Sequence, residues 1–246
     1  MSRRLALVTG GIGGIGTEVC QRLAAAGYTV VASDLSASSE RLSAFSASMA
    51  GLDVHFEAAD ASRMEDCASL VQRIHERHGP VDILVNGAGI TRDASLRKMS
   101  SEHWHEVLRV NLDSVFNLCR LLADDMCERG FGRIVNISSI IGQTGAFGQS
   151  NYAAAKAGMH GFTMALAREL AGKGVTVNSV SPGYVDTAMT AAIPEDLRRQ
   201  MIAAIPVGRI GQPADIAHAI AFLCAEESSY LTGINLPVNG GLFISF

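Results

Sequence analysis

The feature that most constrains the fold is a glycine-rich segment between a short apolar run and a helix-forming stretch. The apolar run LALV spans residues 5–8, and the segment TGGIGGIG follows at residues 9–16. A continuous apolar run of this length is typical of a strand buried on both faces. Glycines allow a sharp turn after such a strand, and residues 17–26 then favour a helix that Gly27 ends. The start of the chain therefore predicts a strand, a tight turn and a helix.

The same alternation continues along the chain. Further strands are expected at residues 29–33, 54–59, 83–86, 133–139, 175–180 and 235–238. Helices are expected at residues 36–50, 63–78, 101–128 (one or two helices), 151–171, 187–205 and 213–225. Strands that alternate with helices favour a parallel sheet with helices on both faces. No linker, repeat or shift in composition divides the chain, so we expect one doubly wound α/β domain over residues 1–246.

Composition and charge exclude several classes of protein. With 246 residues, of which 48% are hydrophobic, the chain can build a large core. No apolar run approaches the ~18 residues of a membrane span, and the N-terminal run is too short for a signal peptide, so we expect no membrane partner. A net charge of −4 argues against a nucleic-acid-binding face. The five cysteines are scattered and odd in number, which favours reduced thiols in a cytoplasmic protein.

The glycine segment is a candidate nucleotide site. Its glycines let a pyrophosphate approach backbone N–H groups, and the helix N-terminus adds a partial positive charge. An ordinary turn between a strand and a helix is the alternative, but the position in the first such unit favours nucleotide binding. The predicted contacts are Gly10, Ile12, Gly13, Gly14, Ile15 and Gly16.

Asp34, at the end of the second expected strand, bears on the kind of nucleotide. A carboxylate there accepts hydrogen bonds from a ribose 2′-OH and repels a 2′-phosphate. Asp34 could also serve as a helix N-cap, and both roles can hold at once. No basic residue lies in the glycine loop or between Asp34 and Arg41, so a 2′-phosphate would find little to neutralise it. We therefore expect NAD(H) to be preferred, with NADP(H) as the alternative, and Asp60 with Ala61 to face the adenine.

A second group of residues suggests catalysis. Tyr152 and Lys156 are four residues apart in an expected helix, which places them on one face. A lysine cation beside a tyrosine favours the phenolate, so we expect the pKa of Tyr152 to be lowered toward that of a usable general acid. Ser139, at the end of an expected strand, can hold a carbonyl oxygen, and Asn111 can orient a water behind Lys156. The Tyr-Lys spacing alone is common in surface helices; the combination with Ser139 and the glycine turn is not.

With these motifs, the chain resembles the short-chain dehydrogenase/reductase family over essentially its whole length. The matching segments are TGGIGGIG (9–16), NGAG (86–89), Asn111, Ser139, YAAAK (152–156) and PG (182–183). The resemblance implies a Rossmann-type fold and hydride transfer from a nicotinamide to a ketone. It also implies that Tyr152 donates the proton, that Lys156 holds the nicotinamide ribose, that Ser139 stabilises the carbonyl oxygen and that Asn111 supports a proton relay.

The resemblance adds further cofactor contacts. They are Asn86, Gly87, Ala88 and Gly89 after the fourth strand, Tyr152 and Lys156, and Pro182, Gly183, Val185 and Thr187 after the sixth. The family's usual NNAG reads NGAG here, so that Gly87 replaces an asparagine. We expect this turn to be looser for lack of that side chain.

Within the family, the chain resembles the acetoacetyl-CoA reductases of polyhydroxybutyrate biosynthesis. The segments GITRD (89–93), RIVNISS (133–139) and GVTVNSVSPGY (174–184) carry this resemblance. It implies an acyl-CoA thioester substrate, acetoacetyl-CoA, reduced to 3-hydroxybutyryl-CoA. It also implies NADPH, from which Asp34 departs. The residues expected to line the substrate pocket are Asp93, Gln143, Phe147, Gln149 and Tyr184.

Other functions remain open at this point. A 3-oxoacyl-acyl-carrier-protein reductase would perform the same chemistry, with Arg129 and Lys173 as contacts for the acidic carrier. An NAD-dependent dehydrogenase of a small alcohol or diol would suit Asp34. A non-catalytic cofactor-binding scaffold would have the same fold, but the presence of all four catalytic residue types argues against it.

Three further expectations concern the assembly and the substrate lid. Related enzymes are homotetramers, so we expect residues 101–128 and 151–171 to form an interface and the apolar end, residues 242–246, to be covered by a neighbour. Residues 187–205 lie where the family carries its lid, where Arg198 and Arg199 either meet CoA phosphates or form a solvated face.

No set of metal ligands with the usual spacing appears, so we expect no metal.

Overall fold

A computed structural model of the chain describes residues 3–35, 37–187, 190 and 194–244. Within these residues, seven strands form one parallel sheet in the order β3-β2-β1-β4-β5-β6-β7. The strands are β1 (Leu5–Thr9), β2 (Thr29–Asp34), β3 (Val54–Ala58), β4 (Ile83–Asn86), β5 (Gly132–Ile137), β6 (Val175–Pro182) and β7 (Asn235–Val238). The expected doubly wound α/β fold is confirmed.

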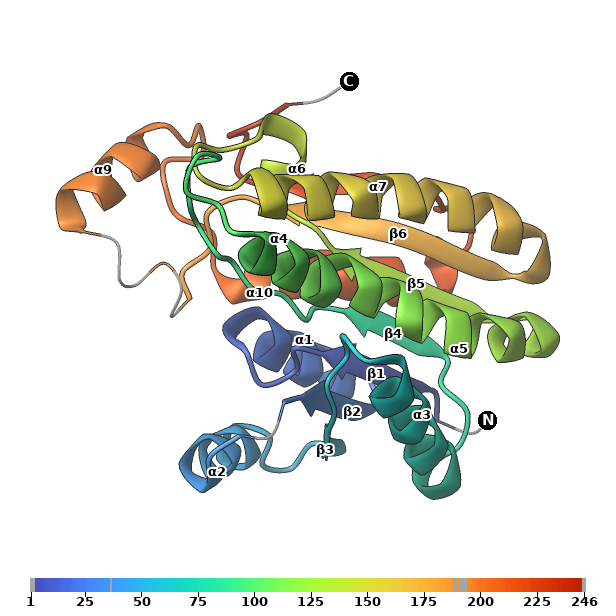
Figure 1. Cartoon of the computed structure of the whole chain (residues 1–246). Helices are drawn as coiled ribbons and strands as arrows, with labels where there is room; N and C mark the ends of the chain where they lie inside the picture. Colours follow the sequence, from blue (N-terminus) through green and yellow to red (C-terminus); the bar gives the residue numbers. More distant parts are fainter. Residues whose placement is uncertain (1–2, 36, 188–189, 191–193, 245–246) are drawn as a thin grey trace.

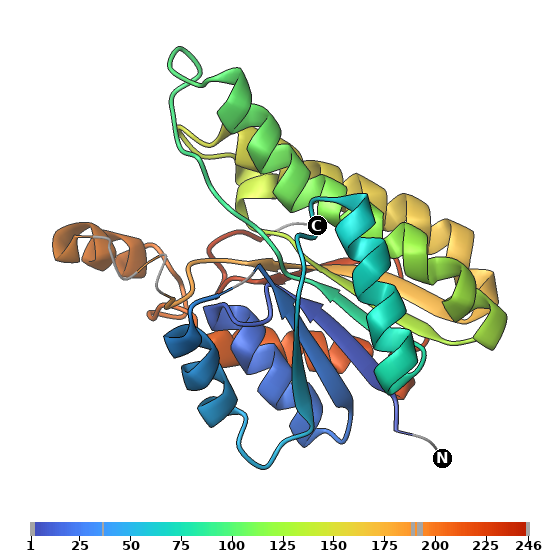
Figure 2. The same cartoon turned by 60° about the horizontal axis from the view of Figure 1, so that its bottom comes forward.

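Helices cover both faces of this sheet (Figure 2). One face packs against α1 (Gly14–Ala25), α2 (Ser39–Ser48) and α10 (Pro213–Cys224). The other packs against α3 (Met64–His78), α5 (Ser114–Arg129) and α7 (Ser150–Leu170). Side chains alternate along each strand as they must in a sheet: Ala6 and Val8 belong to the first core, Leu5 and Leu7 to the second.

The remaining helices lie around one end of the sheet (Figure 1). They are α4 (Ser101–Leu108), the short α6 (Ile141–Thr144) and α9 (Glu195–Ala203). The helix α9 falls in the predicted lid segment, of which residues 188–189 and 191–193 lie outside the described residues. No described helix has both the length and the apolar character needed to cross a bilayer.

Several predicted boundaries shift, and two of the shifts matter for the site. The stretch 101–128 is interrupted by a π-helical turn, Arg109–Asp113, which contains Asn111. Such single turns inside helices are frequent at functional sites. Strand β5 ends at Ile137, so Ser138 and Ser139 lie in the loop beyond it rather than in the strand. Both shifts bring polar side chains to the carboxyl end of the sheet.

The strand order reverses direction between β1 and β4. From β1 the chain proceeds outward to β2 and β3, then returns to β4 on the other side of β1. The loops after β1 and β4 therefore diverge to opposite faces. Open α/β sheets bind ligands in the crevice that this divergence creates.

Candidate active site

A cleft opens at this point of the sheet, and two adjoining cavities make it up. The first has a volume of about 350 Å³ and the second about 480 Å³. Both are lined by Gly10, Gly13, Gly87, Gly89 and Ile90, so they are two halves of one cleft. We call them the inner half, which also contains Ser139, Tyr152 and Lys156, and the outer half, which contains Asp34 and Asp60.

The glycine loop forms the boundary between the two halves. Gly10 has a φ of +64°, and a Cβ placed on it would lie 2.6 Å from the carbonyl oxygen of Gly87. A Cβ on Gly16 would lie 2.0 Å from the carbonyl oxygen of Gly10. The N-cap of α1 is Gly13, which caps the helix with no side chain, so its first-turn amides remain available to a ligand. The loop thus brings bare backbone and the positive end of α1 to the cleft, as a pyrophosphate requires.

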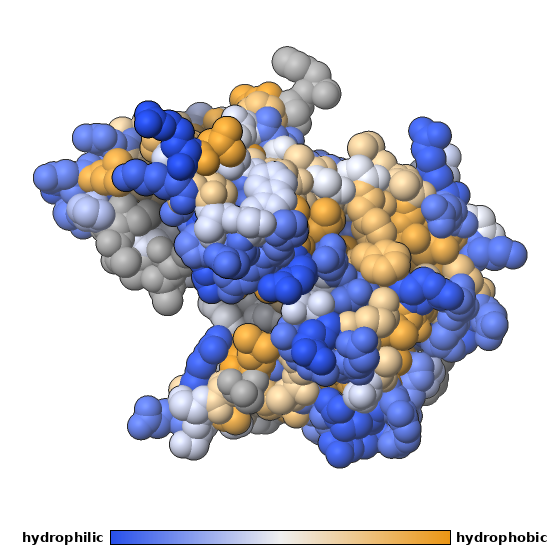
Figure 3. Space-filling view, viewed as in Figure 1, coloured by the Kyte–Doolittle hydropathy of each residue, from blue (hydrophilic) through white to orange (hydrophobic). Residues whose placement is uncertain are grey.

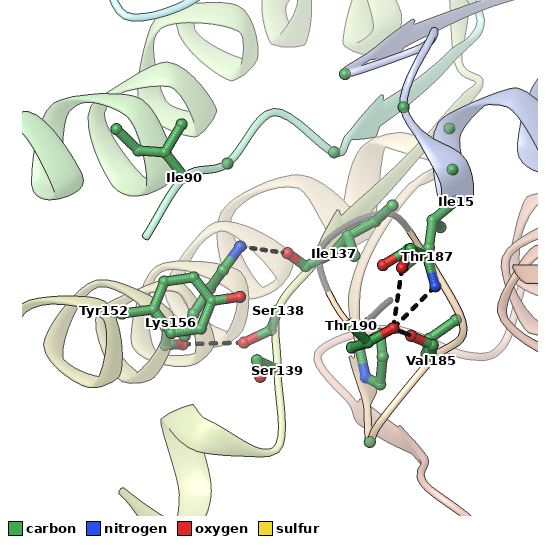
Figure 4. A pocket seen from close by; sticks show the side chains of 18 residues that line it. Ile15, Ile90, Ile137, Ser138, Ser139, Tyr152, Lys156, Val185, Thr187 and Thr190 are labelled. Carbon is green, nitrogen blue, oxygen red and sulfur yellow. Dashed lines mark hydrogen bonds between the residues drawn. The ribbon is translucent and has the colours of Figure 1, made fainter. Parts of the chain in front are cut away.

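Lys156 lies at the bottom of the inner half and is buried. Its Nζ donates a hydrogen bond of 2.7 Å to the carbonyl oxygen of Ile137 and lies 5.5 Å from the centroid of the Tyr152 ring (Figure 4). Burial lowers the pKa of Lys156 to about 7. An ammonium group has three N–H donors, so the Lys156 cation can still donate to a ligand in the cleft.

Tyr152 points into the same cavity from the first turn of α7, with its hydroxyl near Ser139 (Figure 4). Burial raises the pKa of Tyr152, the hydrogen bond with Ser139 lowers it and the charge of Asp93 raises it. The expectation of a pKa lowered by Lys156 is therefore wrong in this structure. The reason is that burial disfavours both the phenolate and the ammonium, so Tyr152 retains its proton at neutral pH.

Asn111 is fully buried in the π-helical turn. Its Nδ2 donates to the carbonyl oxygens of Ile90 and Val107, at 2.9 Å each. Its Oδ1 has no hydrogen-bond partner among the described residues. A Cβ built on Gly89 would lie 2.7 Å from this oxygen and 3.7 Å from Lys156 Nζ. The free acceptor of Asn111 and the ammonium of Lys156 therefore both lie close to Gly89. A polar group placed between them could donate to the Asn111 oxygen and accept from the Lys156 ammonium.

The turn after β4 is well tied in spite of its missing asparagine. The Oγ1 of Thr9 accepts hydrogen bonds from the amides of Gly87 (3.1 Å) and Ala88 (3.3 Å). A Cβ on Gly87 would lie 2.7 Å from the carbonyl oxygen of Thr9, so the turn packs closely against the end of β1. These contacts argue against the expectation that the turn after β4 is looser for lack of the asparagine side chain. Asn86, by contrast, lies below the cleft and donates to Asn136 Oδ1 at 2.8 Å.

The segment after β6 closes the inner half on its other side. The last residue of β6, Pro182, lines it together with Gly183, Val185 and Thr187. Thr190 also lines it, although no motif pointed to this residue. Its Oγ1 donates to the carbonyl oxygen of Val185 (2.6 Å) and accepts from the amide of Thr187 (3.0 Å). The other lining residues that the motifs did not indicate are Ile90, Ile137 and Ser138.

The outer half is bordered by charged side chains. Asp34, Asp60 and Ala61 line it, as does Arg41. The N-cap of α2 is Ser38, which accepts from the amide of Arg41, so Asp34 does not cap this helix. Arg41 Nη2 lies 3.7 Å from Asp34 Oδ2 and donates to the carbonyl oxygen of Ile12. The expectation that little would neutralise a 2′-phosphate here is therefore wrong, because α2 brings Arg41 back to the end of β2. Ile12, a predicted cofactor contact, lines neither half of the cleft, and its carbonyl oxygen accepts the hydrogen bond from Arg41.

The five residues expected in the substrate pocket do not line one cavity. Gln149 Nε2 donates to both carboxylate oxygens of Asp93, at 3.1 and 3.0 Å, and the Phe147 side chain is 96% exposed. Gln143 Oε1 is buried and has no partner within the described part of the chain. Tyr184 lines a separate cavity of about 250 Å³, next to Ile205 and Val207.

The predicted lid residues have partners of their own. Arg198 donates to Asp186 at 3.1 Å, and Arg199 pairs with Asp196. Each of the two guanidinium groups therefore already has a carboxylate partner within the described residues.

Comparisons with known proteins agree with this geometry. The family model described as enoyl-(acyl carrier protein) reductase matches residues 10–243. Acetoacetyl-CoA reductase of Allochromatium vinosum is 59% identical over 98% of this chain and 99% of its own length. Acetoacetyl-CoA reductase of Cupriavidus necator is 48% identical, again over 98% and 99%. The 3-oxoacyl-acyl-carrier-protein reductase of Escherichia coli is 42% identical over 98% of each chain.

Proposed function

Since the chain belongs to the short-chain dehydrogenase/reductase family, we propose that it reduces acetoacetyl-CoA to 3-hydroxybutyryl-CoA. It is an oxidoreductase that acts on a ketone and uses a nicotinamide cofactor. The observation that carries the proposal is the meeting of the Ser139 and Tyr152 hydroxyls in the inner half, beside a buried lysine. Acetoacetyl-CoA is favoured because relatives of that name match over nearly the whole chain.

The cleft fits a dinucleotide. Gly10 and Gly16 have no room for a Cβ, so the loop presents bare backbone to the cleft. The Lys156 ammonium lines the inner half, and the unpartnered Asn111 oxygen is buried next to Gly89 in its wall. The loop amides would hold the pyrophosphate, Asp34 the adenosine ribose, and Asp60 with Ala61 the adenine. Lys156 and the turn after β4 would hold the nicotinamide ribose, with Val185 and Thr187 beside the carboxamide. When bound, the reduced nicotinamide supplies the hydride.

The chain's own residues would handle the carbonyl oxygen and its proton. Ser139 would donate a hydrogen bond to the substrate oxygen and hold it beside Tyr152. Tyr152, protonated at neutral pH because burial raises its pKa, would donate the proton as negative charge develops on that oxygen. The Lys156 cation would stabilise the tyrosinate left behind. Asn111 Oδ1 would accept from a water that returns the proton through Lys156.

For the cofactor, we propose that NADH is the preferred donor and that NADPH is used at a lower rate. The Asp34 carboxylate at the end of β2 suits a ribose 2′-OH. Arg41, which pairs with Asp34 from an exposed position, offers a charge that a 2′-phosphate can recruit. The pair therefore favours NADH without excluding NADPH.

A carrier-protein substrate is the second candidate, and the E. coli relative favours it. Arg129 counts against it. This guanidinium pairs with Asp82 and Asp125 and donates to the carbonyl oxygen of Val81 at 2.6 Å, so it is already committed to its own subunit. A small-alcohol dehydrogenase would oxidise rather than reduce, and a scaffold would bind cofactor without turnover.

The test is the initial rate of reduction with four pairs of reactants: acetoacetyl-CoA or the acetoacetyl carrier protein, each with NADH and NADPH. We expect the highest kcat/KM with acetoacetyl-CoA and NADH. Faster reduction of the carrier-protein thioester would favour the second candidate. A chain that binds NADH but reduces neither thioester would contradict the proposal.

We also propose a homotetramer in the cytoplasm that supplies 3-hydroxybutyryl-CoA to polyhydroxybutyrate synthesis. An apolar hollow of about 400 Å³ lies between α5 and α7, lined by Phe116, Phe162 and Leu166 among others (Figure 3). Phe116 is 49% exposed, which favours cover by a second copy. The five cysteines are free thiols, which suits a reducing compartment. Sedimentation of a Phe116→Asp variant tests the interface: it should yield smaller assemblies, and unchanged tetramers would contradict this.

A further inference from the structure

His160 is a titratable side chain beside the catalytic residues that the mechanism above does not use. It lies on α7, four residues after Lys156 and eight after Tyr152, so the three share one face of the helix. Its ring is half-buried and meets the ends of two strands, β5 and β6. The Nε2 atom lies 2.7 Å from Ser138 Oγ and 3.2 Å from Ser181 Oγ.

The protons of this cluster can be assigned from its partners. The Ser138 hydroxyl donates to the carbonyl oxygen of Lys156 at 3.1 Å. The Ser181 hydroxyl donates to Asn235 Oδ1 at 2.8 Å. Both acceptors are carbonyl oxygens without a proton of their own, and each hydroxyl has only one proton to give. With both hydroxyl protons directed at these carbonyl oxygens, we assign a hydrogen to His160 Nε2, which donates to both serine oxygens.

The electrostatics agree with a neutral ring. Burial lowers the pKa of His160, and the nearby Lys156 lowers it further. The groups that face the ring are Lys156 on its own helix and the uncharged Ser138 and Ser181 from the two loops and strands packed against it. At neutral pH the imidazole thus has one N–H, and that N–H is shared between β5 and β6.

The two serines connect this ring to the cleft. Ser138 directly precedes Ser139, and Ser181, which is fully buried, directly precedes Pro182 and Gly183. Ser138, Ser139, Pro182 and Gly183 all line the inner half. The ring therefore joins the helix that holds Tyr152 to both loops that face it across the cavity.

We propose that His160 is a positioning residue, whose Nε2–H aligns the Ser139 loop and the Pro182–Gly183 segment with Tyr152 and Lys156. The inference rests on the proposed reduction, in which Ser139 and Tyr152 hold the same oxygen. Loss of the shared hydrogen bond would let the loops move relative to α7. Misplacements of about 1 Å cost about 100-fold in rate, so the effect falls mainly on kcat.

Two substitutions of His160 separate its hydrogen bond from its bulk. His160→Leu removes the donor, and we expect kcat for acetoacetyl-CoA to fall about 30-fold with KM changed less than about 2-fold. The Kd for NADH, measured by nicotinamide fluorescence without substrate, should rise about 5-fold, because the Pro182–Gly183 segment loosens. His160→Gln retains an N–H at the position of Nε2, and both values should return to within about 3-fold of the parent.

Thr163→Val is the matched control. Thr163 lies three residues further along α7, and its Oγ1 accepts from Asn136 Nδ2 at 2.9 Å, so it also ties α7 to β5 but away from the cleft. We expect it to lower the thermal midpoint about as much as His160→Leu and to leave kcat and the Kd for NADH within about 2-fold. If His160→Leu does not fold, Ser181→Ala removes one of the two acceptors and should give a smaller loss of the same kind.

Three outcomes would overturn the inference. They are a His160→Leu variant with parental kcat and Kd, a His160→Gln variant as impaired as His160→Leu, and a Thr163→Val variant with the same kinetic loss. A parent chain that reduces no 3-oxoacyl thioester would contradict the proposed function instead. The fluorescence titration would then still judge the role of His160, because it needs no substrate.

Discussion

The inner and outer halves of the cleft are built in different ways. In the inner half, Lys156 is buried and bonded to the backbone of β5, and behind its wall Asn111, next to Gly89, is fixed by two backbone carbonyls. In the outer half, Asp34 is paired with the half-exposed Arg41 at 3.7 Å, a long contact between side chains that solvent reaches. One half is therefore fixed by burial, and the other is adjustable.

This difference separates chemistry from selectivity. A proton transfer depends on atoms held to within a fraction of an ångström, which buried and backbone-bonded side chains provide. A choice between two cofactors depends on a balance of charges at the surface, where each ion pair contributes little and depends on salt. Substitutions in the inner half should thus have large effects of fixed direction, and those in the outer half smaller effects that change with the ligand.

The largest effect is expected for Tyr152→Phe, which removes the proton donor and leaves the ring. We expect kcat to fall about 1,000-fold, since general acid catalysis contributes about 100- to 10,000-fold. The Kd for NADH should stay within about 2-fold, because the phenol acts on the substrate oxygen. Stopped-flow single turnovers and a fluorescence titration measure the two values. Tyr230→Phe, at a 99% exposed position, is the control, and a Tyr152→Phe variant with more than a tenth of parental turnover would contradict the assignment.

The second prediction concerns the cost of burying a charge. The pKa of Lys156 in the folded chain is lowered to about 7, whereas the unfolded value is near 10.5. A group whose folded pKa is depressed in this way destabilises the fold while it is protonated in the unfolded chain, and the cost fades as pH rises from about 7 toward 10.5. Lys156→Met should therefore raise the free energy of unfolding at pH 7 by about 2 kcal/mol, after the loss of the hydrogen bond to Ile137, while it abolishes turnover.

Urea unfolding at pH 7 and at pH 9.5, without added cofactor, tests this prediction. The gain in the free energy of unfolding should be clear at the lower pH and should shrink at the higher one. Lys173→Met replaces an exposed lysine and should change stability by less than about 0.5 kcal/mol at either pH. A Lys156→Met variant less stable than the parent at pH 7 would mean that the inner half accommodates its charge without cost.

What the sequence could predict follows the same division. The parallel sheet, the glycine loop and the pairing of Tyr152 with Lys156 follow from local spacing, because periods of two and 3.6 residues fix which side chains share a face. The proximity of Arg41 to Asp34 could not be predicted, since it depends on the path of the chain between β2 and α2. The raised pKa of Tyr152 depends on burial by segments far apart in the sequence, and so does the separation of Tyr184 from the inner half.

The third prediction changes the adjustable half. Asp34→Ala removes the charge that repels a 2′-phosphate and frees Arg41 from its partner. We expect the ratio of kcat/KM for NADPH to that for NADH to rise about 20-fold, as charge-assisted hydrogen bonds to phosphate contribute about 1.5–3 kcal/mol. Adding Arg41→Ala should remove most of that gain. Steady-state rates at low and high salt measure both, and an unchanged ratio in Asp34→Ala would contradict the role of this carboxylate.

The smallest expected effect tests whether a charge at the surface influences the pKa of Tyr152 in the inner half. Asp93 pairs with Gln149 at the surface, and its negative charge raises the pKa of Tyr152. Asp93→Asn removes the charge and keeps the size, so the pKa of Tyr152 should fall and the alkaline limb of kcat/KM should move to lower pH. At pH 7 the rate should change less than about 2-fold, because the phenol remains protonated there. High salt should shrink the difference between parent and variant, since it screens exposed charges. A limb that does not move would mean that burial alone sets the proton affinity of Tyr152, and that the inner half is insulated from the charges around it.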